Sequence, residues 1–166
     1  MSFSYVDAKR IAVYGWSYGG FMTLRLLEAG SDRIAAGISG APVTDWRLYD
    51  TYYTERFMDR PQDNAAGYEA SSVFTHLGGL TAPLLLIHGM ADDNVLFTNT
   101  TRLISALAAR NVLFDLMTYP GSRHGITPNA NKKHRDKMIE SFLARQLGPK
   151  SSLNNRGESN TVATQK

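Results

Sequence analysis

The sequence contains no cysteine among its 166 residues. Disulfide bonds and thiolate metal sites are therefore excluded, while the redox compartment of the protein stays undetermined. The sequence also has no run of about 18 apolar residues that could cross a membrane. No basic segment followed by an apolar one opens it as a targeting signal would. We therefore expect no membrane segment in this sequence, and its localisation stays open.

A strong charge of one sign is lacking as well, because the formal net charge is only +3. Part of the excess lies in residues 150–166, and a second basic cluster, KKHRDK, spans residues 132–137. Neither segment is interleaved with aromatic residues or glycines, as nucleic-acid-binding surfaces often are. We interpret both as solvated surface and predict no nucleic-acid partner.

Four short apolar runs, each ending in glycine or proline, alternate with segments of helical periodicity. The runs lie at 11–15, 34–43, 83–89 and 114–121. This alternation predicts an α/β fold of about four parallel strands, in chain order and flanked by helices on both sides. Residues 1–148 would form this domain. Residues 149–166 have almost nothing to bury, which predicts a disordered tail.

The first apolar run leads directly into a serine flanked by glycines, Gly15-Trp16-Ser17-Tyr18-Gly19, and then into a helical pattern. This arrangement matches the G-x-S-x-G nucleophile elbow, in which a strained turn between strand and helix exposes the serine. Such a turn leaves no room for side chains on either side, so we expect Gly15 and Gly19 to provide the clearance, which Gly20 extends. Ser17 is therefore the candidate nucleophile.

The partners of such a serine follow it in chain order, an acid and then a histidine, each on a loop after a later strand. Asp92 and Asp93 follow the third apolar run, and His124 follows the fourth. Because the carboxyl ends of parallel strands meet at one edge of the sheet, these loops can approach Ser17. An imidazole would activate the serine hydroxyl, and a carboxylate would orient the imidazole.

Four histidines compete for the role of base. His88 lies inside the end of an apolar run, which indicates a packed and hydrogen-bonded structural residue. His76 lies in an irregular stretch, and His134 lies in a basic helix start. His124 alone combines a loop after a strand with the required chain order, so we assign the base to it.

Several motifs together resemble the catalytic domain of the prolyl oligopeptidase family of serine peptidases, and within it the dipeptidyl peptidase IV branch. They are GWSYGG, APVTDWRLYDTYYTERFM, LLLIHGMADDNV and HGI. The resemblance covers roughly residues 5–147. It implies that Ser17 is the nucleophile, Asp92 the acid and His124 the base, with Asp93 a neighbouring structural carboxylate. The backbone N–H of Tyr18 would be an oxyanion donor.

The resemblance also implies a small pocket for proline or alanine ahead of the cleaved bond. Its residues would be Tyr18, Val43, Trp46, Tyr49, Tyr53 and Val95, with Asn94 contacting the carbonyl region of a peptide substrate. Trp46, Tyr49 and Tyr53 recur at i, i+3 and i+7, so on one helix they would share a face. The alternative is that this aromatic face merely packs on the sheet.

The resemblance further implies the carboxyl-terminal half of an α/β-hydrolase fold. The family's second oxyanion donor, a tyrosine side chain, and its β-propeller would then belong to sequence upstream of residue 1. Full-length relatives are often homodimeric, and we expect the chain by itself to self-associate. We expect serine-peptidase chemistry without a cofactor or metal. The alternatives are an esterase or lipase of the same fold, and a non-catalytic fragment with little activity alone.

Overall fold

The sheet consists of four parallel strands in chain order. The computed structural model describes residues 3–30 and 32–148, so the predicted tail at 149–166 lies outside the described residues. The strands are β1 (Ala12–Trp16), β2 (Ala36–Gly40), β3 (Leu84–Gly89) and β4 (Asp115–Tyr119), in the order β1-β2-β3-β4. The predicted strand positions, parallel pairing and strand order are confirmed.

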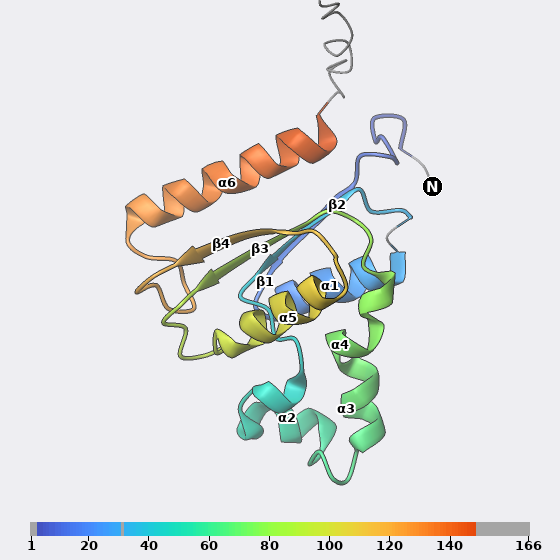
Figure 1. Cartoon of the computed structure of the whole chain (residues 1–166), viewed down its shortest axis with the longest axis vertical. Helices are drawn as coiled ribbons and strands as arrows, with labels where there is room; N and C mark the ends of the chain where they lie inside the picture. The colour runs from blue at the N-terminus through green and yellow to red at the C-terminus, as the bar shows by residue number, and fades with distance from the viewer. Residues whose placement is uncertain (1–2, 31, 149–166) are drawn as a thin grey trace, which may run out of the picture.

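Helices cover both faces of the sheet. Helices α1 (Tyr18–Gly30) and α5 (Thr98–Ala109) lie on one face, and α6 (Asn129–Leu147) lies across the other (Figure 1). Successive residues of β3 point to opposite faces, as in any strand. Leu84 and Leu86 therefore join the core under α1 and α5, whereas Leu85 and Ile87 join the core under α6.

The connection between β2 and β3 is built from short helical pieces. They are the 3-10 helix η1 (Trp46–Leu48), α2 (Thr51–Met58), α3 (Ala65–Ser71), α4 (Val73–His76) and the 3-10 helix η2 (Leu77–Gly79). The expectation that Trp46, Tyr49 and Tyr53 share one helix is therefore wrong. Tyr49 is extended, and the Asp50 side chain accepts a hydrogen bond from the Tyr53 N–H and so starts a new helix.

Strand β1 lies at an edge of the sheet. In the part of the chain that the structure describes, β1 pairs with β2 alone, and Tyr14 on β1 is 54% exposed. Within residues 3–30 and 32–148, no helix has the length and apolar character needed to cross a membrane.

Candidate active site

Ser17 occupies a strained turn between β1 and α1. Its φ angle of 61° lies in the left-handed region, where residues other than glycine are uncommon. The Ser17 N–H donates to the Gly40 carbonyl oxygen at 2.8 Å, and its own carbonyl oxygen accepts from the Phe21 N–H at 3.0 Å. The turn is thereby fixed to β2 on one side and to the first turn of α1 on the other.

Two glycines make this turn sterically possible. They are Gly15, as expected, and Gly20 in place of Gly19. A Cβ on Gly15 would lie 2.1 Å from the Gly19 carbonyl oxygen, and a Cβ on Gly20 would lie 2.4 Å from the Gly40 carbonyl oxygen. A Cβ on Gly19 would meet nothing within 4 Å. Clearance after the serine is thus required at Gly20, where α1 packs closely on β2, and not at Gly19.

The structure brings Asp92 and His124 into direct contact. His124 Nδ1 lies 2.8 Å from Asp92 Oδ2, and the Asp92 side chain is fully buried. The other carboxylate oxygen, Oδ1, accepts the N–H groups of Asn94 at 3.0 Å and Val95 at 3.1 Å. The carboxylate is therefore fixed in orientation. Because Nδ1 of His124 is engaged, Nε2 is the ring nitrogen available for proton transfer.

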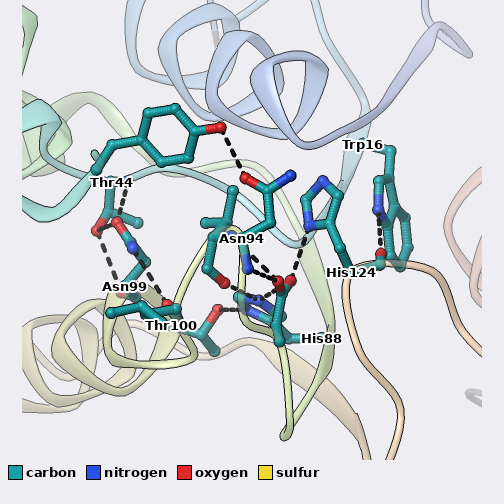
Figure 2. A network of polar contacts seen from close by, with 11 residues as sticks. Trp16, Thr44, His88, Asn94, Asn99, Thr100 and His124 are labelled. Atoms are coloured by element: carbon teal, nitrogen blue, oxygen red, sulfur yellow. Dashed lines mark hydrogen bonds and ion pairs between the residues drawn. The ribbon is translucent and has the colours of Figure 1, made fainter. Parts of the chain in front are cut away.

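The serine turn and the histidine loop are joined through Trp16. Its indole Nε1–H donates to the His124 carbonyl oxygen at 2.9 Å (Figure 2). Among the described residues no hydrogen bond joins the Ser17 hydroxyl to the His124 ring. Catalytic hydrogen bonds are often long without substrate. The Trp16 bond therefore links the serine turn directly to the histidine loop.

Asp93 has a different environment from Asp92. Its side chain is 59% exposed and forms an ion pair with Arg123 at 2.8 Å. None of the hydrogen bonds among the described residues joins Asp93 to a histidine. Of the two adjacent aspartates, only Asp92 is placed to orient an imidazole.

The other histidines lie in three separate environments. His76 is exposed with Nε2 near the Ala70 carbonyl oxygen, and His134 pairs with the Tyr119 hydroxyl at 2.9 Å. His88 is fully buried and hydrogen-bonded, as its position in an apolar run indicated. It also contacts Asp92 at 3.0 Å, a contact that was not predicted from the sequence. No sequence pattern signalled this contact, because i, i+4 contacts are expected on helices and His88 lies on a strand.

A small pocket opens beside the serine. Its volume is about 150 Å³, and its lining residues are Ser17, Tyr18, Val43, Trp46, Tyr49 and Tyr53. The rings of Tyr18 and Tyr53 lie 5.6 Å and 6.1 Å from that of Trp46. Five of the seven residues expected around the substrate therefore line one cavity with the candidate nucleophile, although they come from separate elements.

The remaining two expected residues lie outside that lining. Val95 is fully buried in the same core cluster as Val43 and Trp46, and its backbone N–H donates to Asp92. Asn94 is connected to the pocket because its Oδ1 accepts a hydrogen bond from the Tyr49 hydroxyl at 2.7 Å. A larger cavity of about 420 Å³ shares Tyr18, Trp46 and Tyr53 with the small pocket.

A buried hydrogen bond joins the segment after Val43 to helix α5, which follows the Asp92 loop. The Thr44 N–H donates to Asn99 Oδ1 at 2.9 Å, and both side chains are fully buried (Figure 2). Thr44 follows Val43 of the pocket, and Asn99 is the second residue of α5, the helix after the Asp92 loop. Asn99 lies outside the motifs found in the sequence, so this pair was not predictable from the sequence.

Oxyanion stabilisation has one candidate donor in the described residues. Tyr18 begins α1, and the first N–H groups of a helix have no partner within the helix. Its N–H, on the residue after Ser17, therefore remains the candidate donor. In the same part of the chain, no group of three His, Cys, Asp or Glu residues is arranged to hold a metal ion.

The sequence of this chain matches a known protein family. Residues 1–150 match the model of the prolyl oligopeptidase family. A "Probable dipeptidyl-aminopeptidase B" of Arthroderma gypseum is 49% identical over 143 residues, which are 84% of this chain and 15% of the relative. One of Uncinocarpus reesii is 50% identical over 125 residues, covering 74% of this chain and 14% of that protein.

A solved structure shows the same similarity in three dimensions. The crystal structure of Porphyromonas gingivalis dipeptidyl peptidase 4 superposes with a TM-score of 0.84 at 44% identity, covering 86% of this chain and 20% of that one. The strands and flanking helices therefore form part of an α/β-hydrolase domain. This chain spans only about 15% of the length of the curated relatives. Because the family model matches residues 1–150, the chain belongs to the prolyl oligopeptidase family.

Proposed function

We propose that this chain carries the catalytic triad of a serine peptidase, with Ser17 as nucleophile, His124 as base and Asp92 as acid. The observation that carries the proposal is the 2.8 Å contact between His124 and the buried Asp92, beside a serine in a strained turn. The names of the relatives, dipeptidyl-aminopeptidase B and dipeptidyl peptidase 4, support the release of dipeptides from peptide substrates.

The proposed reaction proceeds through an acyl-enzyme. Ser17 Oγ attacks the peptide carbonyl carbon while its proton passes to His124 Nε2. The negative charge on the carbonyl oxygen is stabilised by the Tyr18 N–H. The peptide C–N bond then breaks, the leaving amine takes the proton from His124, and water hydrolyses the ester by the same steps in reverse. Asp92 stabilises the imidazolium throughout.

The small pocket supports a preference for proline or alanine next to the cleaved bond. A volume of about 150 Å³ suits a short apolar side chain, and its aromatic walls can pack on a pyrrolidine ring. Asn94, held by the Tyr49 hydroxyl, would contact the carbonyl region of the substrate. The alternative interpretation, that the rings only pack on the sheet, leaves this cavity beside Ser17 without a role.

Covalent labelling tests the triad without requiring turnover. A fluorophosphonate probe reacts with an activated serine, so we expect rapid labelling of the wild-type chain and none of Ser17→Ala. Asp92→Asn should slow labelling by several orders of magnitude, because the imidazole loses its orienting partner. Asp93→Asn is the matched control and should label within a few-fold of wild type.

The outcomes separate the candidate functions. Normal labelling of Asp92→Asn beside an unreactive Asp93→Asn would overturn the choice of acid. Turnover of simple esters without turnover of Xaa-Pro amides would favour an esterase of the same fold. Absence of labelling in a folded chain would indicate a non-catalytic fragment.

A further inference from the structure

His88 is a buried titratable group that the proposed reaction does not use. It lies near the end of β3 with a fully buried ring, four residues before Asp92. Its ring makes three polar contacts with described residues, two at Nε2 and one at Nδ1. A histidine present only for packing would need one satisfied partner at each nitrogen, so the double contact at Nε2 requires an explanation.

The partners of the ring determine where its proton lies. Nε2 is 3.0 Å from Asp92 Oδ2 and 3.0 Å from the Val95 carbonyl oxygen, and both of these atoms can only accept from it. Nε2 must therefore carry the hydrogen. Nδ1 lies 2.7 Å from Thr100 Oγ1, a hydroxyl that can donate. A neutral ring protonated at Nε2 satisfies every partner.

The surroundings favour this neutral form. Burial lowers the pKa of His88, although the carboxylate of Asp92 opposes that effect. The titratable groups that face the ring are Asp92 and His124, while Thr100, the Val95 carbonyl and the ring of Phe97 are uncharged. His88 thus acts as a hydrogen-bond donor of fixed orientation.

The Asp92 carboxylate accepts four donors from the described residues, divided equally between its oxygens. Oδ1 accepts two backbone N–H groups, and Oδ2 accepts both imidazoles, from His124 at 2.8 Å and from His88 at 3.0 Å. Figure 2 shows both labelled imidazoles, His88 and His124, within one network of hydrogen bonds. Several donors keep a buried carboxylate ionised. Without His88, Oδ2 would keep only the candidate base as a donor among these residues.

We propose that His88 is a positioning residue of the triad, whose Nε2–H keeps the Asp92 carboxylate ionised and turned toward His124. The proposal rests on the proposed function for the roles of Asp92 and His124. The coupling between the three side chains, however, is a property of the folded chain and is measurable without activity.

The direction in which loss of His88 changes the proton affinity follows from Asp92 Oδ2, the oxygen that both imidazoles contact. Removing the Nε2–H withdraws a donor from the carboxylate, which raises the proton affinity of the Asp92–His124 pair. This holds whichever of the two groups receives the proton, because tightly coupled groups titrate as a pair. Loss of one hydrogen bond to a charged group corresponds to an upward shift of about one pH unit.

The experiment uses the 166-residue chain with isotope-labelled histidines and records their ring resonances by NMR against pH. In the wild type we expect His88 to be protonated at Nε2 only at neutral pH, because burial lowers the pKa of its ring. In His88→Leu the titration of His124 should move up by about one unit. His88→Gln places an amide donor near the same position, and its shift should stay below about 0.3 unit.

Each outcome decides the proposal. A wild-type His88 protonated at Nδ1 would overturn it, and this measurement needs no variant, so a poorly folded His88→Leu leaves the test intact. Equal His124 titrations in folded His88→Leu and wild type would overturn it as well. Fluorophosphonate labelling, run in parallel, reports on the proposed function. A chain that shows the shift but never labels would refute peptidase activity and leave the coupling established.

Discussion

Tyr49 connects the pocket to the acid loop through two separate parts of its side chain. Its ring lies 6.0 Å from the ring of Trp46 and 5.5 Å from that of Tyr53, while its hydroxyl donates to Asn94. Burial raises the pKa of the Tyr49 hydroxyl, so it remains a donor at neutral pH. The ring and the hydroxyl can therefore be tested separately.

Tyr49→Ala removes both parts and should lower the preference for proline over larger residues by about tenfold or more, because one apolar pocket contact contributes about 1–3 kcal/mol to discrimination. Tyr49→Phe keeps the ring and should retain most of that preference. The measurement is kcat/KM for paired Ala-Pro and Ala-Leu chromogenic substrates. Equal losses on both substrates together with a lower Tm would instead support a packing role for the aromatic residues.

At the scale of the element, α1 combines the first N–H groups beside Ser17 with a buried acid near its other end. The Glu28 side chain is only 2% exposed, and Oε2 pairs with Arg25 at 2.6 Å. Its other oxygen, Oε1, has no hydrogen-bond partner among the residues that the structure describes. Burial outweighs the attraction of Arg25 and raises the pKa of Glu28 from 4.5 to about 7.

This pKa predicts how the stability of α1 depends on pH. Between pH 4.5 and about 7 the folded chain binds more protons at Glu28 than the unfolded chain, so stability falls as the pH rises through this window. Glu28→Gln should therefore stabilise the chain by about 1 kcal/mol at pH 8, with less effect at pH 5. Thermal unfolding at both pH values measures this.

The exposed Glu140 on α6 supplies the control, since Glu140→Gln should leave the difference in Tm between the two pH values unchanged. A Glu28→Gln variant that is less stable than wild type at pH 8 would contradict the prediction. It would mean that the ion pair with Arg25 outweighs the cost of burying the carboxylate.

At the scale of the whole molecule, helices cover the two faces of the sheet but not its edges. In the described residues α1 and α5 cover one face and α6 the other, whereas β1 and β4 each pair with one strand alone. Tyr14 on β1 is 54% exposed, and Met22 and Leu26 on the adjoining α1 are 39% and 44% exposed. Unpaired strand edges bordered by apolar side chains recruit other strands.

We therefore predict that the purified chain forms dimers or larger species, measured by size-exclusion chromatography with light scattering. Tyr14→Lys places a charge on the edge strand and should shift the population toward monomer. Tyr52→Lys, at an 84% exposed position on α2, is the matched control and should not. A concentration-independent monomer in the wild-type chain would refute the prediction.

The sequence by itself determined the strands and their order, and it limited the acid to Asp92 or Asp93 and the base to His124. Short apolar runs ended by glycine or proline specify buried parallel strands, and the carboxyl ends of such strands meet at one edge. The G-x-S-x-G turn needs only local sterics, so its position at Ser17 was also predictable. Each strand and the serine turn are specified by patterns within a few residues, and the parallel arrangement then brings the loops after the strands to one edge.

The tertiary structure alone decided which groups meet across loops. Clearance at Gly20 instead of Gly19 depends on how closely α1 approaches β2, and no local pattern contains that distance. Val95 is buried outside the pocket lining while its N–H donates to Asp92, and no local pattern specifies that position. Hydrogen bonds from Trp16 to the His124 loop and from His88 to Asp92 join residues whose proximity arises only when the sheet is assembled, because a side chain's partners are set by packing in space.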